Sequence, residues 1–297
     1  MENFQIKCVG KQTRKRLQRK WLTLKNRKPL LIHLLKYLWS SLLGLMLIIA
    51  VMYRIINGGI KKAPHCASRG SSSPPTDIIL DFEKIRNFER GPLERVKNFT
   101  IDGYVGYLLD DAGKEHYTLL NYISAKYGDC RPFVDIGTRY VTSALALGSH
   151  ESAVWTFDIP QSSERRHAFR GKTEAEWQRM VTEAGIDITF HNVDLLQASD
   201  DDFKTYFGTW FILLDTFHKP YSQPFERELF QRMVDIGFKG ILMLDDIYLN
   251  EEMKKWWKEI KNQAERGNYR AHDLSEIGHS TGTGLVDFSG MVTVKGQ

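Results

Sequence analysis

Apolar and polar positions form alternating blocks along residues 78–297, and these blocks predict the elements of an α/β domain. Short apolar runs bounded by Gly, Pro or Asp predict buried strands over 132–137, 153–159, 186–196, 209–215 and 240–246. Segments with helical periodicity predict helices over 114–128, 142–148, 173–185, 224–238 and 250–267. Strands that alternate with helices in this way indicate a parallel sheet covered by helices.

Local signals mark several boundaries of these elements. Thr173 and Glu176 form a capping-box pattern at the start of one predicted helix, and Asn250 is a candidate N-cap of another. The chain closes with two predicted strands, 268–275 and 285–296, joined by the glycine-rich segment 278–284. We therefore predict five β-α units followed by a terminal hairpin, which makes a seven-stranded sheet.

A different pattern precedes this domain. Residues 37–53 contain no charged side chain, and the apolar character extends back to Leu30. A helix that crosses a bilayer needs about 17–25 such residues, so we predict one transmembrane helix over 29–56. Tyr37, Trp39 and Tyr53 are of the types found where such a helix meets the interface.

The charge of the chain is divided at this predicted helix. The total is +5, but residues 1–62 hold 14 Lys and Arg against one acidic residue, so residues 63–297 carry a net charge of −8. Eleven of these basic residues lie before or at the start of the predicted span, which predicts a cytoplasmic N-terminus and a type II signal-anchor topology. The acidic domain disfavours nucleic acid as a partner.

These patterns divide the chain into a basic cytoplasmic tail (1–28), a transmembrane helix (29–56), a Ser- and Pro-rich linker or stem (57–77) and a folded domain (78–297). The topology places that domain in a Golgi-like lumen or otherwise outside the cytoplasm. Asn98 and Thr100 form a glycosylation sequon, which agrees with that placement. Cys66 and Cys130 can form a disulfide there or remain free thiols.

Acidic residues stand at the end of every predicted parallel strand. They are Asp135, Asp158, Asp194, Asp215 and the adjacent pair Asp245 and Asp246. In open α/β sheets, ligands bind at the carboxyl ends of the strands. A single such residue is typically a cap or a solvated loop residue, but five strands that all end in this way indicate a ligand site.

The first two strands suggest a nucleoside. Asp158 follows Asp135 by 23 residues, close to the spacing of about 20 at which an acid accepts hydrogen bonds from ribose hydroxyls. The intervening loop, 135–143, lacks the G-x-G-x-x-G pattern that lets a backbone approach a pyrophosphate. This disfavours a dinucleotide, and with it a nicotinamide-dependent oxidoreductase, and favours a ligand that has a ribose and no phosphate.

The motifs at 134–148, 155–159 and 191–196 resemble the first three motifs of class I S-adenosylmethionine-dependent methyltransferases. The resemblance covers about residues 100–297 and implies a Rossmann-like seven-stranded sheet with an antiparallel terminal hairpin. It implies that Asp158 holds the ribose and Asp194 meets the adenine amine. It also implies that the loop residues bind the donor, namely Asp135, Gly137, Thr138 and Ser143. The second glycine usual in that loop is replaced by Tyr140 or Val141.

The ends of the fourth and fifth strands suggest a metal. Asp215, Asp245 and Asp246 together repel one another unless a cation neutralises them, and oxygen ligands suit Mg²⁺, Mn²⁺ or Ca²⁺. This set resembles the metal-dependent O-methyltransferases of the catechol type and, more closely, those that act on macrolide sugars. The resemblance implies a divalent ion that binds two neighbouring oxygens of the acceptor.

His218 follows Asp215 by three residues, and the sugar enzymes have a basic histidine at this spacing. We therefore expect His218 to take the proton of the acceptor hydroxyl, with Lys219 as the alternative. Near the same edge, 278–284 contributes His279, Ser280, Thr281 and Thr283, which either line the substrate site or form a flexible turn.

The sequence thus predicts a membrane-anchored, divalent-metal-dependent O-methyltransferase whose acceptor is a hydroxyl of a sugar or glycan. Two alternatives stay open at this point. One is methylation of a small phenolic or lipid-like molecule. The other is a catalytically inactive domain that binds a nucleoside.

Overall fold

The computed structural model describes residues 75–128, 131–159, 167–218 and 223–297. The chain divides into two units, Met1–Lys61 and Lys62–Gln297, and the described residues all belong to the second. The predicted basic tail, transmembrane helix and all but the last three residues of the predicted stem lie outside the described residues, as do Cys8, Cys66, Cys130 and Lys219. In the described part of the chain, the helices are too short or too polar to cross a bilayer.

Most predicted elements are present. The strands are β1 Ile78–Asp81, β2 Phe133–Ile136, β3 Ala153–Asp158, β4 Asp187–Asn192, β5 Phe211–Leu214, β6 Ile241–Asp245, β7 Arg270–Asp273, β8 Thr283–Asp287 and β9 Val292–Lys295. The helices are α2 Phe82–Arg86, α3 Gly91–Val96, α4 Asp102–Leu108, α5 Tyr117–Tyr127, α6 Thr142–Leu147, α8 Glu174–Glu183, α9 Asp200–Tyr206, α10 Gln223–Asp235 and α11 Glu251–Ala264, with a 3₁₀ turn at Lys97–Phe99.

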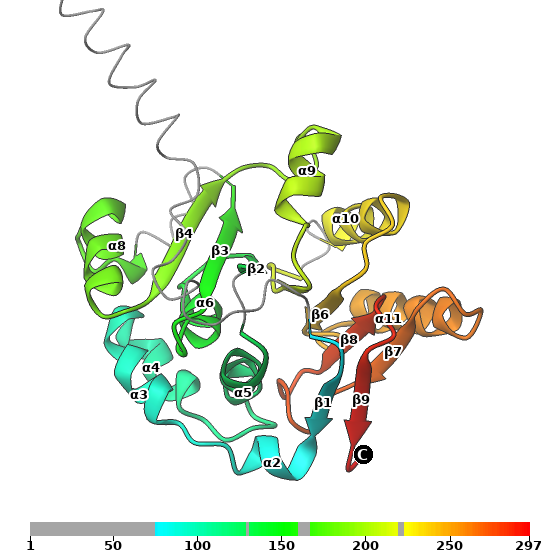
Figure 1. The fold of residues 1–297 in the computed structure, drawn as a ribbon, viewed down its shortest axis with the longest axis horizontal. Coiled ribbons are helices and arrows are strands. Elements are labelled where there is room, and N and C mark those ends of the chain that lie inside the picture. The colour runs from blue at the N-terminus through cyan, green and yellow to red at the C-terminus, as the bar shows by residue number, and fades with distance from the viewer. Residues whose placement is uncertain (1–74, 129–130, 160–166, 219–222) are drawn as a thin grey trace, which may run out of the picture. The chain divides into compact units, whose positions relative to one another are not determined.

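The predicted sheet is confirmed. Seven strands lie in the order β4-β3-β2-β5-β6-β8-β7 (Figure 1). The five strands from β2 to β6 pair in parallel, whereas β8 is antiparallel to both β6 and β7. Each parallel strand is followed by a helix, which gives the predicted five β-α units and the terminal antiparallel pair. This is the sheet that the class I methyltransferase motifs imply.

The central strands are buried on both faces, as their continuous apolar runs predict. In β5 and β6, Phe211, Leu213, Ile241 and Met243 belong to one core, which also includes residues of α5, α6 and α8. The alternating residues of the same strands belong to a second core with α9, α10 and α11. Figure 1 shows these two sets of helices on opposite sides of the sheet. Side chains that alternate between faces thus anchor both helical layers.

One helix is more buried than its sequence pattern predicts. The segment 114–128 shows one apolar face, but the first eight residues of α5 are all buried, including Asn121 and Ser124. The short helices α2, α3 and α4, which the sequence pattern did not reveal, pack against α5 together with α6. Asn121 donates to the Glu89 carbonyl at 2.7 Å, so burial of its amide is compensated.

The end of the chain departs from the prediction. The segment 285–296 is not one strand, because it ends its pairing in the main sheet at Asp287. The buried Asp287 carboxylate accepts hydrogen bonds from the backbone N–H groups of Ser289, Gly290 and Val292 at 2.8–3.1 Å. This turns the chain, and β9 pairs in parallel with β1 in a separate two-stranded sheet (Figure 1).

The strand prediction over 186–196 is also too long. β4 ends at Asn192, because the Asp194 carboxylate accepts a hydrogen bond from the Leu196 N–H at 3.0 Å and so forms a turn. The turn brings Asp194 to the carboxyl edge of the sheet. Chain order reverses between β2 and β5, so this edge contains the switch point at which α/β sheets bind ligands.

Candidate functional site

A cavity of about 460 Å³ lies at the carboxyl ends of β2, β3, β4 and β5. This volume falls in the range of about 300–1,000 Å³ that is typical of small-molecule sites. Its walls are mainly apolar and include Ile136, Phe157, Leu195, Leu196 and Phe225. The cavity can therefore enclose a flat, uncharged ring.

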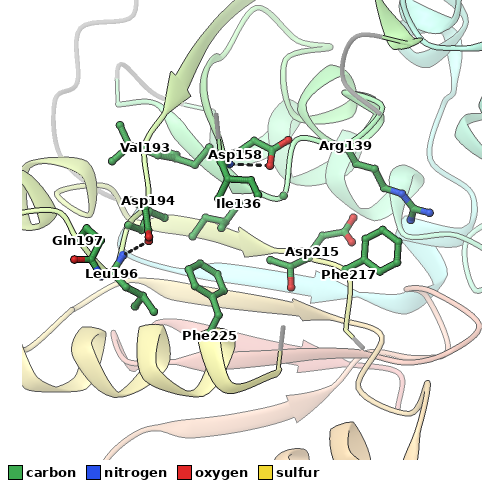
Figure 2. Close-up of a pocket in the computed structure, with 15 residues that line it drawn as sticks. Ile136, Arg139, Asp158, Val193, Asp194, Leu196, Gln197, Asp215, Phe217 and Phe225 are labelled. Atoms are coloured by element: carbon green, nitrogen blue, oxygen red, sulfur yellow. Dashed lines mark hydrogen bonds between the residues drawn. The ribbon is translucent and has the colours of Figure 1, made fainter. Parts of the chain in front are cut away.

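Three acidic residues line this cavity, and they stand at two ends of it (Figure 2). Asp158 and Asp194 lie on the side of β3 and β4, and each accepts a hydrogen bond from a backbone N–H of its own turn, from Ile159 at 2.8 Å and from Leu196 at 3.0 Å. These bonds hold both carboxylates in position. Asp215 lies at the other end, beside Phe217 and Arg139.

The predicted donor-binding loop is divided by the structure. Gly137 lines the cavity, but Asp135, Thr138 and Ser143 are buried beneath it. The Thr156 hydroxyl donates to Asp135 at 2.7 Å and lies 2.7 Å from the Thr138 hydroxyl. Burial raises the pKa of Asp135 to about 6. These side chains are therefore held by contacts within the protein and do not line the cavity.

The loops at this edge contain unusual backbone conformations. Six described non-glycine residues have positive φ, and four of them lie here: Arg139 and Val141 after β2, His218 after β5 and Asp246 after β6. Positive φ is rare for branched side chains such as Val141, and such strain is commonly found at functional sites. The loop therefore adopts turns that normally require glycine although glycine is absent at those positions.

Behind Asp215 lies a cluster of acids and imidazoles that are buried or partly buried. His116, directly before α5, has Nδ1 3.1 Å from Asp245 Oδ1 and Nε2 3.9 Å from Asp215 Oδ2. His279, in the loop before β8, has Nδ1 3.3 Å from Asp245 Oδ1 and Nε2 3.3 Å from Glu115 Oε2. The two imidazoles therefore share one carboxylate, at the end of β6.

His218 lies on the other side of Asp215. Its Nε2 is 3.6 Å from Asp215 Oδ1, and its Nδ1 is 2.9 Å from Oε1 of Glu226, a fully buried residue of α10. The Thr216 hydroxyl donates to the same Glu226 oxygen. The imidazole therefore lies between two carboxylates, and their charges favour its protonated form.

The three predicted metal ligands are only partly brought together. Among the described residues, two groups have ligand atoms within 4.8 Å of one another: Asp215 with His218 and Asp245, and His116 with Asp245 and His279. Asp246 belongs to neither group. Thr281 donates a hydrogen bond to it, and its Oδ1 lies 2.9 Å from His279 Nδ1. Each of the two groups therefore contains one or two imidazoles and does not contain the third carboxylate predicted from the sequence.

These contacts control the charges of the cluster. Burial would lower the pKa of His116, but the charges of Asp245 and Asp215 raise it to about 9. The pKa values of His218 and His279 are raised by their carboxylate partners in the same way. Burial and the Asp245 charge raise the pKa of Asp215, whereas the imidazoles outweigh burial at Asp245 and lower its pKa. In the protein alone, imidazolium groups therefore neutralise the acids.

Sequence analysis missed three members of this cluster, Glu226, His116 and Glu115. Glu226 left a signal, because it occupies the buried stripe of α10 together with Leu229, Phe230 and Met233, where a charge is unexpected. His116 left none, since it stands before the first turn of a helix and pairs with residues about 100 or more positions away. His279 was noticed as a residue of this edge.

Comparisons with known proteins complete this description. No family model and no curated protein matches the chain. Solved structures that are similar to it include an S-adenosylhomocysteine-bound methyltransferase, PaMTH1, from Podospora anserina, with 13% identity, 58% of this chain and 76% of that chain covered, and a TM-score of 0.39. A candidate caffeoyl-CoA O-methyltransferase from Staphylococcus aureus has 11% identity, coverages of 52% and 75% and a TM-score of 0.36. Magnesium protoporphyrin IX methyltransferase from Synechocystis PCC 6803, also with bound S-adenosylhomocysteine, has 14% identity and a TM-score of 0.37. The match covers 69% of this chain and 96% of that chain.

The contact between Gly137 and the end of β5 predicts a specific effect of a methyl group. A Cβ at Gly137 would lie 1.8 Å from the Asp215 carbonyl oxygen, and φ is +104°. We expect Gly137→Ala to lower the free energy of unfolding by more than the roughly 1–2 kcal/mol of the backbone conformation alone. Gly237→Ala is the matched control, since φ is +68° there and its Cβ would meet nothing within 4 Å. Urea unfolding measures both; equal losses would contradict the contact.

The buried pair of His218 and Glu226 predicts a pH-dependent loss of stability. Because the pKa of His218 is raised above its unfolded value, the stability from this pair is present below about pH 6.5 and declines as the pH rises through the folded pKa. We expect Glu226→Gln to lower the free energy of unfolding by roughly 3–5 kcal/mol at pH 6 and by less at pH 10. Urea unfolding at both pH values measures this, with the exposed Glu228→Gln as control. A loss that does not change with pH would contradict the ion pair.

Proposed function

We propose that the domain is an S-adenosylmethionine-dependent methyltransferase that methylates a hydroxyl group. The observation that carries the proposal is the position of Asp215. It lines the cavity in which Asp158 and Asp194 stand, and it also contacts His218 at 3.6 Å. A donor site and a candidate proton acceptor are therefore adjacent, as transfer between two bound molecules requires.

The cavity suits the donor. Asp158 would accept hydrogen bonds from the ribose hydroxyls and Asp194 from the adenine amine, while the apolar walls would enclose the ring. Of the described residues that line the cavity, Arg139 is the one basic residue. The described lining therefore lacks the cluster of positive charges that would bind a pyrophosphate. S-adenosylmethionine, when bound, supplies an electrophilic methyl group on a sulfonium.

His218 would accept the proton of the acceptor hydroxyl. Glu226 holds Nδ1, which leaves Nε2 on the side of Asp215. To act as a base, His218 must be neutral, and its raised pKa works against this in the protein alone. A cation that takes up the charge of Asp215 removes one of the two causes of that shift.

A divalent ion is part of the proposal. Asp245 is buried and Asp215 is partly exposed to the cavity, and their carboxylates can bind the ion together with the neighbouring imidazoles. An ion there supplies Lewis-acid activation of the acceptor hydroxyl. An acceptor with two neighbouring oxygens would use it best.

We propose a sugar or glycan as the acceptor. Phe217 lines the cavity, is 38% exposed and has the Arg139 guanidinium 5.4 Å above its ring. Arg139 lies similarly close to the rings of Tyr104 and Tyr140. The partly exposed ring of Phe217 at the cavity suits an acceptor ring with apolar and hydroxylated sides.

The placement in the cell is also a proposal. The uncharged segment within 29–56 and the excess of basic residues before it support a single-pass type II membrane protein with a cytoplasmic N-terminus. The domain then works in a Golgi-like lumen or outside the cell, where glycans are available. The donor must cross the membrane to reach it.

Binding of the product nucleoside tests the donor site. We expect the full-length chain to bind S-adenosylhomocysteine in isothermal titration calorimetry, and Asp158→Ala to weaken this binding at least about tenfold, because a charge-assisted hydrogen bond contributes roughly 1.5–3 kcal/mol. Asp187→Ala is the control, because Asp187 begins β4 and so lies at the end of that strand away from the cavity. Absence of nucleoside binding in the unmodified chain would refute the methyltransferase proposal.

Methyl transfer tests the base. We expect His218→Ala to lower the rate of transfer from S-adenosylmethionine to a glycoside with adjacent hydroxyls by roughly 10²–10⁴, with unchanged affinity for S-adenosylhomocysteine. Lys219→Ala is made for comparison, since Lys219 is the alternative base. If the rate falls for Lys219→Ala and not for His218→Ala, the role of His218 is wrong.

A further inference from the structure

The imidazole-rich half of the cluster indicates which class of ion is bound. His116, Asp245 and His279 come from three separate elements: the residue before α5, the last residue of β6 and the loop before β8. Their ligand atoms all lie within 4.8 Å of one another. The two rings have centroids 5.9 Å apart and planes at 85°, so their nitrogens approach Asp245 from different directions.

We infer that His116, Asp245 and His279 form a two-histidine, one-carboxylate site for a transition-metal ion such as Zn²⁺, Fe²⁺ or Mn²⁺, in preference to Mg²⁺ or Ca²⁺. The inference rests on the proposed function, because it names the metal and the ligands of that site. Asp245 remains a ligand, and the two imidazoles take the places that Asp215 and Asp246 have in the all-carboxylate set expected from the sequence.

The spacing of the ligand atoms fits such an ion. Bonds of about 2.1 Å to nitrogen and oxygen place neighbouring ligands roughly 3.0 Å apart in an octahedral site and roughly 3.4 Å apart in a tetrahedral one. The observed separations from Asp245 Oδ1 to Nδ1 of His116 and of His279 are 3.1 and 3.3 Å. Small movements of these side chains would therefore suffice for a shared ion.

The outer contacts of both imidazoles have the arrangement found around metal-bound histidines. A histidine that binds a metal through one nitrogen usually directs the other towards a carboxylate, which fixes the ring and its tautomer. His116 directs Nε2 towards Asp215 at 3.9 Å, and His279 directs Nε2 towards Glu115 at 3.3 Å. In both, Nδ1 is the nitrogen that faces Asp245.

Burial adds an independent argument. His116 is 1% exposed and Asp245 3%, yet His116 Nε2 has no hydrogen-bond partner among the described residues. An ion on Nδ1 does not contact this atom, but it fixes the ring in the tautomer that carries its proton on Nε2, the nitrogen that faces Asp215 at 3.9 Å.

The donor types decide between classes of ion. Mg²⁺ and Ca²⁺ prefer sites made of oxygen atoms, whereas imidazole nitrogen suits Zn²⁺, Fe²⁺ and related ions. Two nitrogens and one carboxylate leave further coordination positions open, as catalytic sites require. Asp246 Oδ1, 2.9 Å from His279 Nδ1, is one more oxygen that can enter the set.

Metal binding by the full-length chain tests the inference without any need for activity. The chain is produced without a histidine tag and with Cys8, Cys66 and Cys130 replaced by Ser, because thiolates also bind zinc. After removal of metal with a chelator, Zn²⁺ and Mg²⁺ are titrated separately by calorimetry. We expect one Zn²⁺ per chain, bound more tightly than Mg²⁺, and at least about tenfold weaker Zn²⁺ binding in His116→Ala and in His279→Ala.

Control variants separate the site from general effects. His191→Ala removes a partly buried histidine of β4 outside the cluster and should leave the Zn²⁺ affinity unchanged. If His116→Ala does not fold, as judged by circular dichroism, His279→Ala in the loop before β8 still decides the outcome. Glu115→Gln should weaken Zn²⁺ binding through His279 while it leaves all three ligands in place.

Absence of Zn²⁺ binding would overturn the inference and make the cluster a set of ion pairs only. Binding of Mg²⁺ as tight as that of Zn²⁺ would also overturn it, as would an unchanged Zn²⁺ affinity in both histidine variants. Titration of S-adenosylhomocysteine into the same metal-free chain keeps the two proposals apart. Nucleoside binding without Zn²⁺ binding refutes the metal site alone, and Zn²⁺ binding without nucleoside binding supports the metal site and refutes the methyltransferase.

Discussion

The carboxylate of Asp245 is the interaction on which the edge of the sheet depends. It ends a strand that is buried on both faces, and it lies 3.1 Å from one imidazole and 3.3 Å from another. An unpaired charge in such a place would be costly, so positive groups must converge on it from outside the strand. The residue before α5 and the loop before β8 deliver them. A second acid, Asp215, enters the same network through His116 and His218.

The fold explains why this network lies beside a cavity. Two apolar cores hold helices on both faces of the sheet. The strand order reverses between β2 and β5, and this switch point is where α/β sheets bind ligands. Gly137 and Asp215 directly follow these two strands and pack so closely that a methyl group between them has no room. Four residues in the surrounding loops have positive φ, and such conformations persist only where the surrounding structure holds them. A rigid edge of this kind can keep a donor, a base and an ion in register.

Periodicity was sufficient to predict the sheet, because continuous apolar runs and capping signals such as Thr173 with Glu176 are local. The position of Asp158, Asp194 and Asp215 on one edge followed from topology. Long-range geometry could not be predicted in the same way. The turn at Asp287, the left-handed backbone of Asp246 and the pairing of His116 with Asp245 depend on contacts between distant segments. Glu226 was the exception, since a charge within the apolar stripe of α10 is visible in the sequence.

Photochemical cross-linking of the nucleoside tests the central claim most directly, because it locates the donor as well as detecting it. The full-length chain is irradiated with tritiated S-adenosylmethionine, digested and sequenced by mass spectrometry. The account predicts label in peptides that contain the cavity residues at 136–139, 157–159 or 193–197, and loss of the label when unlabelled S-adenosylhomocysteine is added. Label confined to other segments, or label that S-adenosylhomocysteine does not displace, would contradict it.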